Sequence, residues 1–365
     1  MRGNVEPQAG MFCLISPESR VPQAHPLRRM KKLVDEVLRD LSPLFEEMYA
    51  QTGRPSIPPE RLLKAKMLQA LYTIRSENLL IESLEYNNLL FRWFLDLNLT
   101  DPVWDNSTFT KNQGLLLGHQ TAELFFARIV GLAREHGWVS DEHFTVDGSL
   151  IDAWASLKSF QPKTGPKDPT DGDSGNASVD FHGQRRSNAT HQSTTDEQAQ
   201  LARKGRGKEA RMCYGLHVLM ENRHGLCVQA QITTAYGTTE STAATELLAR
   251  QLDTAEQPPQ SLGADKGYHN AEVVGFCREH GIKPHIAKLK GRKVAGLDGR
   301  TTGSLGYQTS QRLRKRVEEI FGWAKEIGGL RRTRKRGVDR MGLSGRLILS
   351  AYNLVRMGKL LGNST

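Results

Sequence analysis

Apolar and polar residues alternate along the chain with two different periods, and these periods predict its elements. In residues 225–233, aliphatic side chains alternate with Cys, Gln and Thr, a period of two that predicts a β-strand. A turn at 222–225 joins this strand to a preceding one at 214–221, so that the two form a hairpin. The same criteria predict strands at 143–151, 260–265 and 282–289 and helices at 241–252, 270–280 and 314–325.

The predicted elements follow the order β-β-β-α-β-α-β-α. Three antiparallel strands followed by a helical crossover can place the fourth strand beside the first and parallel to it. We therefore expect an α/β fold with a mixed sheet and flanking helices. In such a sheet the carboxyl ends of the first and fourth strands lie at the same edge.

The first third of the chain has helical patterns instead. A Pro-Pro pair at 58–59 favours the first turn of a helix, and leucines at helical spacing follow it. We expect a flexible N-terminus at 1–26, a helical domain at 27–136 and a second domain at 140–361. The helical domain has no clear helix-turn-helix signature, and it could bind DNA, mediate dimerisation or serve only in packing. Residues 156–207 are rich in Pro, Gly, Ser, Thr, Asp and Gln, which predicts a polar, partly disordered insertion.

Two aspartates stand at the ends of predicted strands. Asp147 is followed by Gly148, and Asp265 by a Lys-Gly pair. If the first and fourth strands are neighbours, both carboxylates lie at the carboxyl edge of the sheet, where open α/β sheets bind ligands. Taken alone, each aspartate is more often a turn residue, because Asp favours turns. Asp152 is an alternative to Asp147, but an unbroken strand would turn it to the opposite face.

A third acid, Glu318, lies on the last predicted helix between two cations. Arg314, Glu318 and Lys325 are spaced by four and seven residues and share one narrow stripe. An apolar arc at 313, 317, 320, 321 and 324 lies next to this stripe and would hold the helix against a core. Glu319 points about 100° away. Isolated pairs four residues apart contribute only about 0.2–0.5 kcal/mol, so the stripe matters only if the two aspartates meet it.

Positive charge is concentrated near this helix. The chain has 50 Lys and Arg against 40 Asp and Glu, and residues 288–365 hold 19 of those basic and 5 of those acidic side chains. The densest run, at 331–336, follows the helix directly. Such a run is often only a solvated surface, but its position favours binding to DNA phosphates, with affinity that falls as salt rises.

Composition excludes several other classes of protein. The chain has no apolar stretch near the ~20 residues of a membrane span, and its N-terminus lacks the apolar core of a signal peptide. The four cysteines have no Cys-x-x-Cys spacing, which predicts neither a zinc site nor a disulfide framework and favours a reducing cytoplasm. His217 could bind metal from its strand, but a hydrogen-bonded structural histidine is the commoner case.

These motifs resemble the ribonuclease H-like catalytic domain of DDE transposases from bacterial insertion sequences. The signature helix of that family has Tyr, two residues, Arg, three residues, Glu, six residues and Lys. Arg314, Glu318 and Lys325 fit this spacing, whereas Gln311 stands at the Tyr position. The stretches 57–63, 101–105, 317–325 and 328–331 are also similar to the family.

The resemblance implies a mixed five-stranded sheet and a catalytic triad of Asp147, Asp265 and Glu318. It implies that the triad binds Mg²⁺, with Mn²⁺ as a substitute and two ions per site, since hard cations prefer carboxylate oxygens. It further implies cleavage at transposon terminal inverted repeats, transfer of the 3′-hydroxyl strand into target DNA, a homodimer on DNA, and a bacterial, nucleoid-associated cytoplasmic protein. The residues expected to bind DNA are Arg314, Lys325, Arg331, Arg332, Arg334, Lys335 and Arg336. A nuclease of the same fold and a non-catalytic DNA-binding protein derived from a transposase are the alternatives, although the presence of all three acids disfavours the second.

Overall fold

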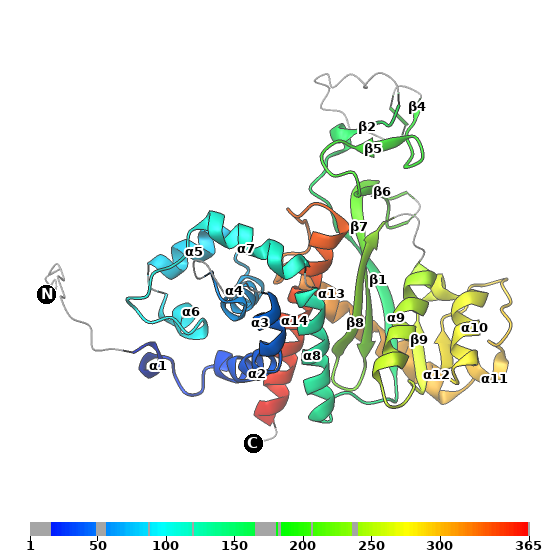
Figure 1. Ribbon diagram of the computed structural model, residues 1–365. Helices are drawn as coiled ribbons and strands as arrows, with labels where there is room; N and C mark the ends of the chain where they lie inside the picture. Colours follow the sequence, from blue (N-terminus) through cyan, green and yellow to red (C-terminus); the bar gives the residue numbers. More distant parts are fainter. Residues whose placement is uncertain are drawn as a thin grey trace, which may run out of the picture.

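A mixed β-sheet forms the centre of the molecule in the computed structural model (Figure 1). The structure describes residues 16–48, 56–86, 88–118, 120–164, 180–181, 184–205, 207–235 and 240–363. The sheet contains β1 (Phe144–Asp152), β6 (Gln200–Ala202), β7 (Arg211–Glu221), β8 (Leu226–Thr234), β9 (Ser261–Ala264) and β10 (Lys283–Ile286).

The strand order confirms the predicted arrangement. The order is β10-β9-β1-β7, with β8 on the outer side of β7. β7 is antiparallel to β1 and β8, whereas β9 is parallel to β1 and β10 is parallel to β9. The fourth strand of the predicted series thus lies beside the first, as in a ribonuclease H-like sheet. The short β6 pairs with β7 beyond the end of β8 and makes the sheet six-stranded rather than five-stranded.

Helices cover both faces of the sheet. One face is covered by α9 (Glu240–Thr254), which packs on β1, β7 and β8, and α10 (Ala271–Glu279) packs on α9. Among the later helices, α12 packs on β9 and β10, α13 on β1, and α14 on β8. Their bounds are α11 Gly299–Thr302, α12 Leu305–Leu313, α13 Val317–Glu326 and α14 Val338–Asn363, with 3₁₀ turns η2 at Lys266–Tyr268 and η3 at Arg314–Arg316.

The N-terminal third is helical, as expected, and it shares a core with the rest of the chain. Its helices are α1 Pro17–Arg20, α2 Pro26–Asp40, α3 Ser42–Met48, α4 Pro59–Leu71, α5 Glu77–Glu85, α6 Leu89–Phe94, α7 Asn106–Gly118 and α8 Thr121–Glu135. The C-terminal helix α14 packs against α2, α4 and α8 as well as against β8. The two regions are therefore joined by one continuous hydrophobic core, with α14 between them (Figure 1).

Two segments expected to be flexible or partly disordered contain ordered elements. In the expected flexible N-terminus, residues 1–15 lie outside the described residues, but α1 follows and Val21 is buried. In the expected insertion, Phe160 and Ala199 are buried, and β2 pairs with β5. The remaining elements of that segment are η1 Leu157–Ser159, β2 Phe160–Pro162, β3 Asp180–Phe181, β4 Gln184–Arg185 and β5 His191–Ser193.

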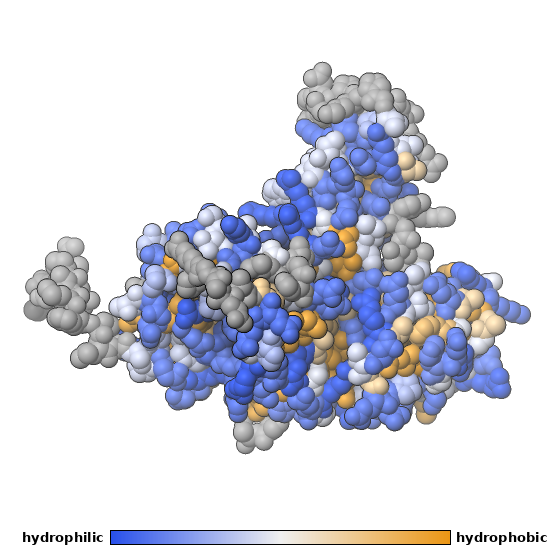
Figure 2. All heavy atoms as spheres, viewed as in Figure 1, coloured by the Kyte–Doolittle hydropathy of each residue, from blue (hydrophilic) through white to orange (hydrophobic). Residues whose placement is uncertain are grey.

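The surface is mostly polar on the face shown in Figure 2, where hydrophobic side chains are confined to small separate areas. Among the described residues, none of the helices combines the length and the apolar character needed to cross a bilayer.

Candidate active site

Asp147 and Asp265 lie side by side at the point where β1 and β9 separate. The two strands are paired in parallel at Phe144 with Leu262 and at Thr145 with Gly263. Asp147 comes two residues after the last pair on β1. Asp265 comes two residues after Gly263, directly beyond the end of β9, and caps the 3₁₀ turn η2. The structure therefore brings together the two aspartates that the sequence placed at strand ends.

The charges of three other acids act on Asp147. Burial and the charges of Asp265, Glu318 and Glu240 raise its pKa to about 7, although a hydrogen bond from the backbone N–H of Gly148 to its Oδ1, at 2.8 Å, opposes the shift. Like charges held close together in a partly buried site favour the neutral form. A bound cation is the species that would relieve this repulsion.

The helix α13 lies over β1 on the face that carries Asp147. Lys325, near the end of α13, donates a hydrogen bond of 2.7 Å from Nζ to Oγ of Ser149. Ser149 is two residues after Asp147 on β1 and so shares its face. Glu318, in the first turn of α13, is close enough for its charge to act on Asp147. The neighbouring Glu319 lies 3.8 Å from both Arg316 and Arg356 instead.

Arg314 lies in the 3₁₀ turn η3 and not on the α-helix that carries Glu318, which corrects the prediction of one regular helix. The chain runs from α12 through η3 into α13, so the stripe is interrupted by this tighter turn. Gln311, at the signature Tyr position, accepts a hydrogen bond of 2.9 Å from Nε of Arg314 and donates one of 2.5 Å to the carbonyl of His285. Gln311 thereby connects Arg314 to the end of β10.

A fourth carboxylate, that of Glu240, belongs to the same cluster, and the sequence analysis missed it. Glu240 is the first residue of α9, one residue before the predicted start of that helix. The charge of Glu240 contributes to the raised pKa of Asp147. Burial away from water and the charge of Asp265 raise the pKa of Glu240 itself. In the sequence, the role of Glu240 is indicated only by its position as an acid at the start of the helix that follows the hairpin.

Two alternative candidates have other partners. Asp152 forms an ion pair of 3.1 Å with Arg211, and its backbone bonds to residues 331–333. His217 forms a hydrogen bond of 3.1 Å with Thr233, and burial lowers its pKa to about 4, so it is neutral. Asp152 and His217 thus have partners of their own outside the carboxylate cluster.

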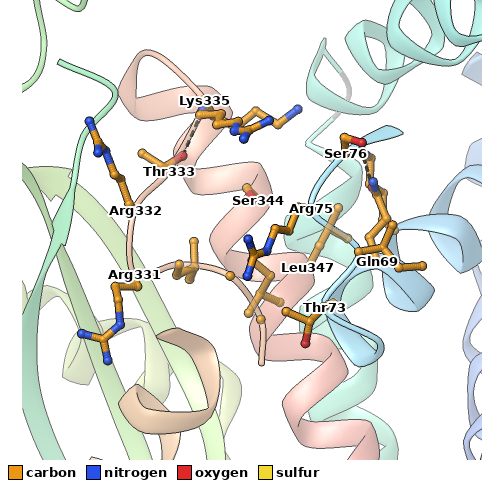
Figure 3. A pocket seen from close by; sticks show the side chains of 18 of the residues that line it. Gln69, Thr73, Arg75, Ser76, Arg331, Arg332, Thr333, Lys335, Ser344 and Leu347 are labelled. Atoms are coloured by element: carbon orange, nitrogen blue, oxygen red, sulfur yellow. Dashed lines mark hydrogen bonds between the residues drawn. The ribbon is translucent and has the colours of Figure 1, made fainter. Parts of the chain in front are cut away.

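The basic run after α13 is held beside the end of β1 and forms one wall of a cleft. Asp152 and Arg332 form an isolated parallel bridge, so this segment continues the sheet for one residue. The cleft has a volume of about 570 Å³ and lies between the segment 325–335, the segment 66–77 and the start of α14. Figure 3 shows Arg331, Arg332 and Lys335 on one side, Gln69, Thr73 and Arg75 on the other, and Ser344 and Leu347 on α14 between them.

Within this cleft, Trp154 and Glu77 position several of the cations. The guanidinium carbons of Arg332 and Arg334 lie 5.4 Å and 5.7 Å from the centre of the Trp154 ring, within the range of cation–π attraction. Lys335 bonds to Glu77 of the helical region at 3.1 Å. Arg331 forms an exposed ion pair with Glu326, and Arg336 is exposed. The cleft is thus basic on both sides and includes one aromatic side chain.

The donor set of the cluster fits a hard divalent cation. Its side chains offer carboxylate oxygens, which Mg²⁺ and Mn²⁺ prefer to nitrogen or sulfur. In the described part of the chain, no three His, Cys, Asp or Glu side chains already surround a single point closely enough to share an ion. Binding therefore requires some of these side chains to rotate toward the ion.

Comparisons with known proteins give two family matches. A model described as "Transposase domain (DUF772)" matches residues 15–114, and one described as "Transposase DDE domain" matches residues 181–354. The second match includes Asp265 and Glu318 but not Asp147. No curated protein matches the chain. Among solved structures, a piggyBac transposase synaptic complex with hairpin DNA is similar at a TM-score of 0.40 and 10% identity, covering 93% of this chain and 76% of that one.

The mixed sheet and the two family matches define a DNA-cleaving and strand-transferring enzyme. One matched transposase domain covers most of the helical third and the other covers most of the α/β domain, and together they support a DDE transposase. These matches support the DNA transposase function that the resemblance of the sequence implied.

Proposed function

We propose that Asp147, Asp265 and Glu318 bind two Mg²⁺ ions, or Mn²⁺ in their place, and that this site cleaves the DNA strand at transposon ends and joins it to target DNA. The parallel register that makes Asp147 and Asp265 neighbours, with the charge of Glu318 close by, carries the proposal. When bound, the two ions would supply an activated nucleophile and stabilise the leaving oxygen.

Arg314 and Lys325 bind phosphates on either side of this cluster. Lys325 is held over Ser149, roughly 7 Å along β1 from Asp147, at about 3.3 Å per residue. Its ammonium is therefore placed for a phosphate that neighbours the scissile one. Gln311 fixes the guanidinium of Arg314 from the other side, through the hydrogen bond to Nε. These cations attract the DNA backbone to a site whose own carboxylates would repel it.

The basic cleft between α13 and the helical region binds the DNA duplex beside the cut. Arg331, Arg332, Arg334 and Lys335 line one wall, and Arg75 approaches from the helical region. Phosphate contacts of this kind fix the position of the duplex but do not read its sequence. On this proposal the helical third contributes to DNA binding directly, and the bound DNA comprises the terminal inverted repeats and, later, the target.

The test is cleavage and strand transfer on labelled DNA that carries the transposon ends, with Mg²⁺ or with EDTA. Glu318→Ala should abolish both reactions, because it removes a proposed ligand. Glu319→Ala is the matched control, since Glu319 contacts Arg316 and Arg356 rather than the cluster. Equal loss in both variants, or activity in EDTA, would contradict the assignment. Cleavage without joining in the wild type would favour the nuclease alternative.

Two further parts of the proposal concern assembly and location. Joining two transposon ends requires two active sites, which favours a homodimer on DNA, and cross-linking of the DNA-bound protein would test it. Because DNA is the substrate, we place the reaction at the bacterial nucleoid, where a fluorescent fusion should be found.

A further inference from the structure

Glu240 faces the gap between the two aspartate-bearing strands. A methyl group added at Gly267 would lie 3.2 Å from Oε2 of Glu240 and 2.9 Å from Oδ1 of Asp265. One added at Gly148, next to Asp147, would lie 3.5 Å from Oε1 of Glu240. The two oxygens of Glu240 thus approach both sides of the gap. Glycine at 267 leaves room for that carboxylate.

A buried hydroxyl next to the same carboxylates has no partner. The Tyr268 side chain is fully buried, and among the described residues its hydroxyl makes no hydrogen bond. Burial raises its pKa well above the ordinary value, and the charges of Glu240, Asp147 and Asp265 act in the same direction. An unsatisfied buried polar group costs about 1–3 kcal/mol. A hydrated cation bound between the acids would provide the missing partner.

We infer that Glu240 is a fourth carboxylate ligand of the divalent-cation site, supplied by the start of α9. The inference rests on the proposed function, because it assigns Glu240 to the ions held by Asp147, Asp265 and Glu318. A fourth carboxylate adds negative charge and oxygen ligands, both of which strengthen the binding of a hard divalent cation. It also holds the N-terminus of α9 close to the ends of β1 and β9.

If Glu240 only stabilised the start of α9, its replacement by Gln would lower the stability of the protein and leave Mn²⁺ binding unchanged. An acid in the first turn of a helix stabilises it through the helix dipole by about 0.3–1 kcal/mol. Glu272, an exposed acid in the first turn of α10, has that role, and Asp147 and Tyr268 are perturbed by other acids. Glu272→Gln is therefore the matched control for Glu240→Gln.

The experiment measures Mn²⁺ binding to the full-length protein without DNA, by electron paramagnetic resonance of free Mn²⁺, and urea unfolding in EDTA at pH 8. Glu240→Gln should weaken Mn²⁺ binding by about 10-fold or more, on the scale of changes to the ligand environment of a metal. It should be at least as stable as the wild type in EDTA, because one repelling charge is gone. Glu272→Gln should bind Mn²⁺ like the wild type.

Asp147→Asn separates the two proposals. If Asp147→Asn loses Mn²⁺ and Glu240→Gln binds it like the wild type, the role of Glu240 is overturned while the proposed function stands. If Asp147→Asn itself binds Mn²⁺ like the wild type, Asp147 is not a metal ligand and the proposed function is contradicted. Should Glu240→Gln fold poorly, Tyr268→Phe gives the second measurement, since it removes only the hydroxyl. Mn²⁺ affinity unchanged in Tyr268→Phe would then overturn the inference.

Discussion

Replacing Asp147 by Asn should make the metal-free protein more stable above neutral pH, although it removes a proposed catalytic group. The pKa of Asp147 in the folded protein is about 7, against an ordinary value of 3.8, because the group is buried among other acids. A carboxyl whose pKa is raised by folding binds its proton more tightly in the folded state. The free energy of unfolding therefore falls as pH rises from about 3.8 to about 7, and then levels off.

The size of the effect follows from the shift. Between pH 5 and pH 8, about two pH units lie inside this window, and each corresponds to about 1.36 kcal/mol. The wild type should thus lose roughly 3 kcal/mol over this range relative to Asp147→Asn, which has no such carboxyl to ionise. Asp265, Glu318 and Glu240 contribute to the loss, because their charges raise the pKa of Asp147.

The assay is urea denaturation of both proteins in EDTA at pH 5, 6, 7 and 8. Asp253→Asn, which neutralises an exposed acid near the end of α9, controls for the loss of one charge. Addition of Mg²⁺ at pH 8 should stabilise the wild type and not Asp147→Asn. If the difference between wild type and Asp147→Asn stays constant from pH 5 to pH 8, the acids are not coupled as the structure indicates, and the reasoning is refuted.

Substitutions at four other positions test separate parts of the site. Lys325→Met should reduce strand transfer by at least 10-fold while leaving Mn²⁺ affinity unchanged, because it removes the cation held over Ser149 and none of the carboxylates. If Lys325→Met and the wild type are equally active in a gel assay, the phosphate role of Lys325 is contradicted. Gln311→Leu should weaken DNA cleavage several-fold by freeing the guanidinium of Arg314, whereas Gln311→Glu, which can still accept from Nε, should retain more activity. Trp154→Ala should weaken duplex binding by about 2- to 10-fold, because about 0.5–1 kcal/mol or somewhat more of cation–π attraction is lost. Arg332→Ala should weaken binding and also reduce its salt dependence by about one phosphate contact. A fluorescence-anisotropy titration measures both effects.

Local patterns were sufficient for much of the fold because they report directly on burial. The period of two in residues 226–232 predicted β8, and the Pro-Pro pair predicted the start of α4. Parallel pairing of β1 and β9 followed from the element order, in which a helical crossover comes after three antiparallel strands. The same reasoning missed the 3₁₀ turn at Arg314–Arg316, because hydrophobic spacing does not distinguish a tighter turn from an α-helix.

The sequence by itself determined which residue types lie at the ends of strands and on the signature helix, and its resemblance to DDE transposases singled out Asp147, Asp265 and Glu318 among them. Only the tertiary structure decided what else joins them. Glu240 enters the cluster because α9 begins beside the gap between β1 and β9, and the basic cleft exists because α14 holds the helical third against the sheet. Such juxtapositions depend on contacts between residues far apart in the chain, and no local periodicity encodes them.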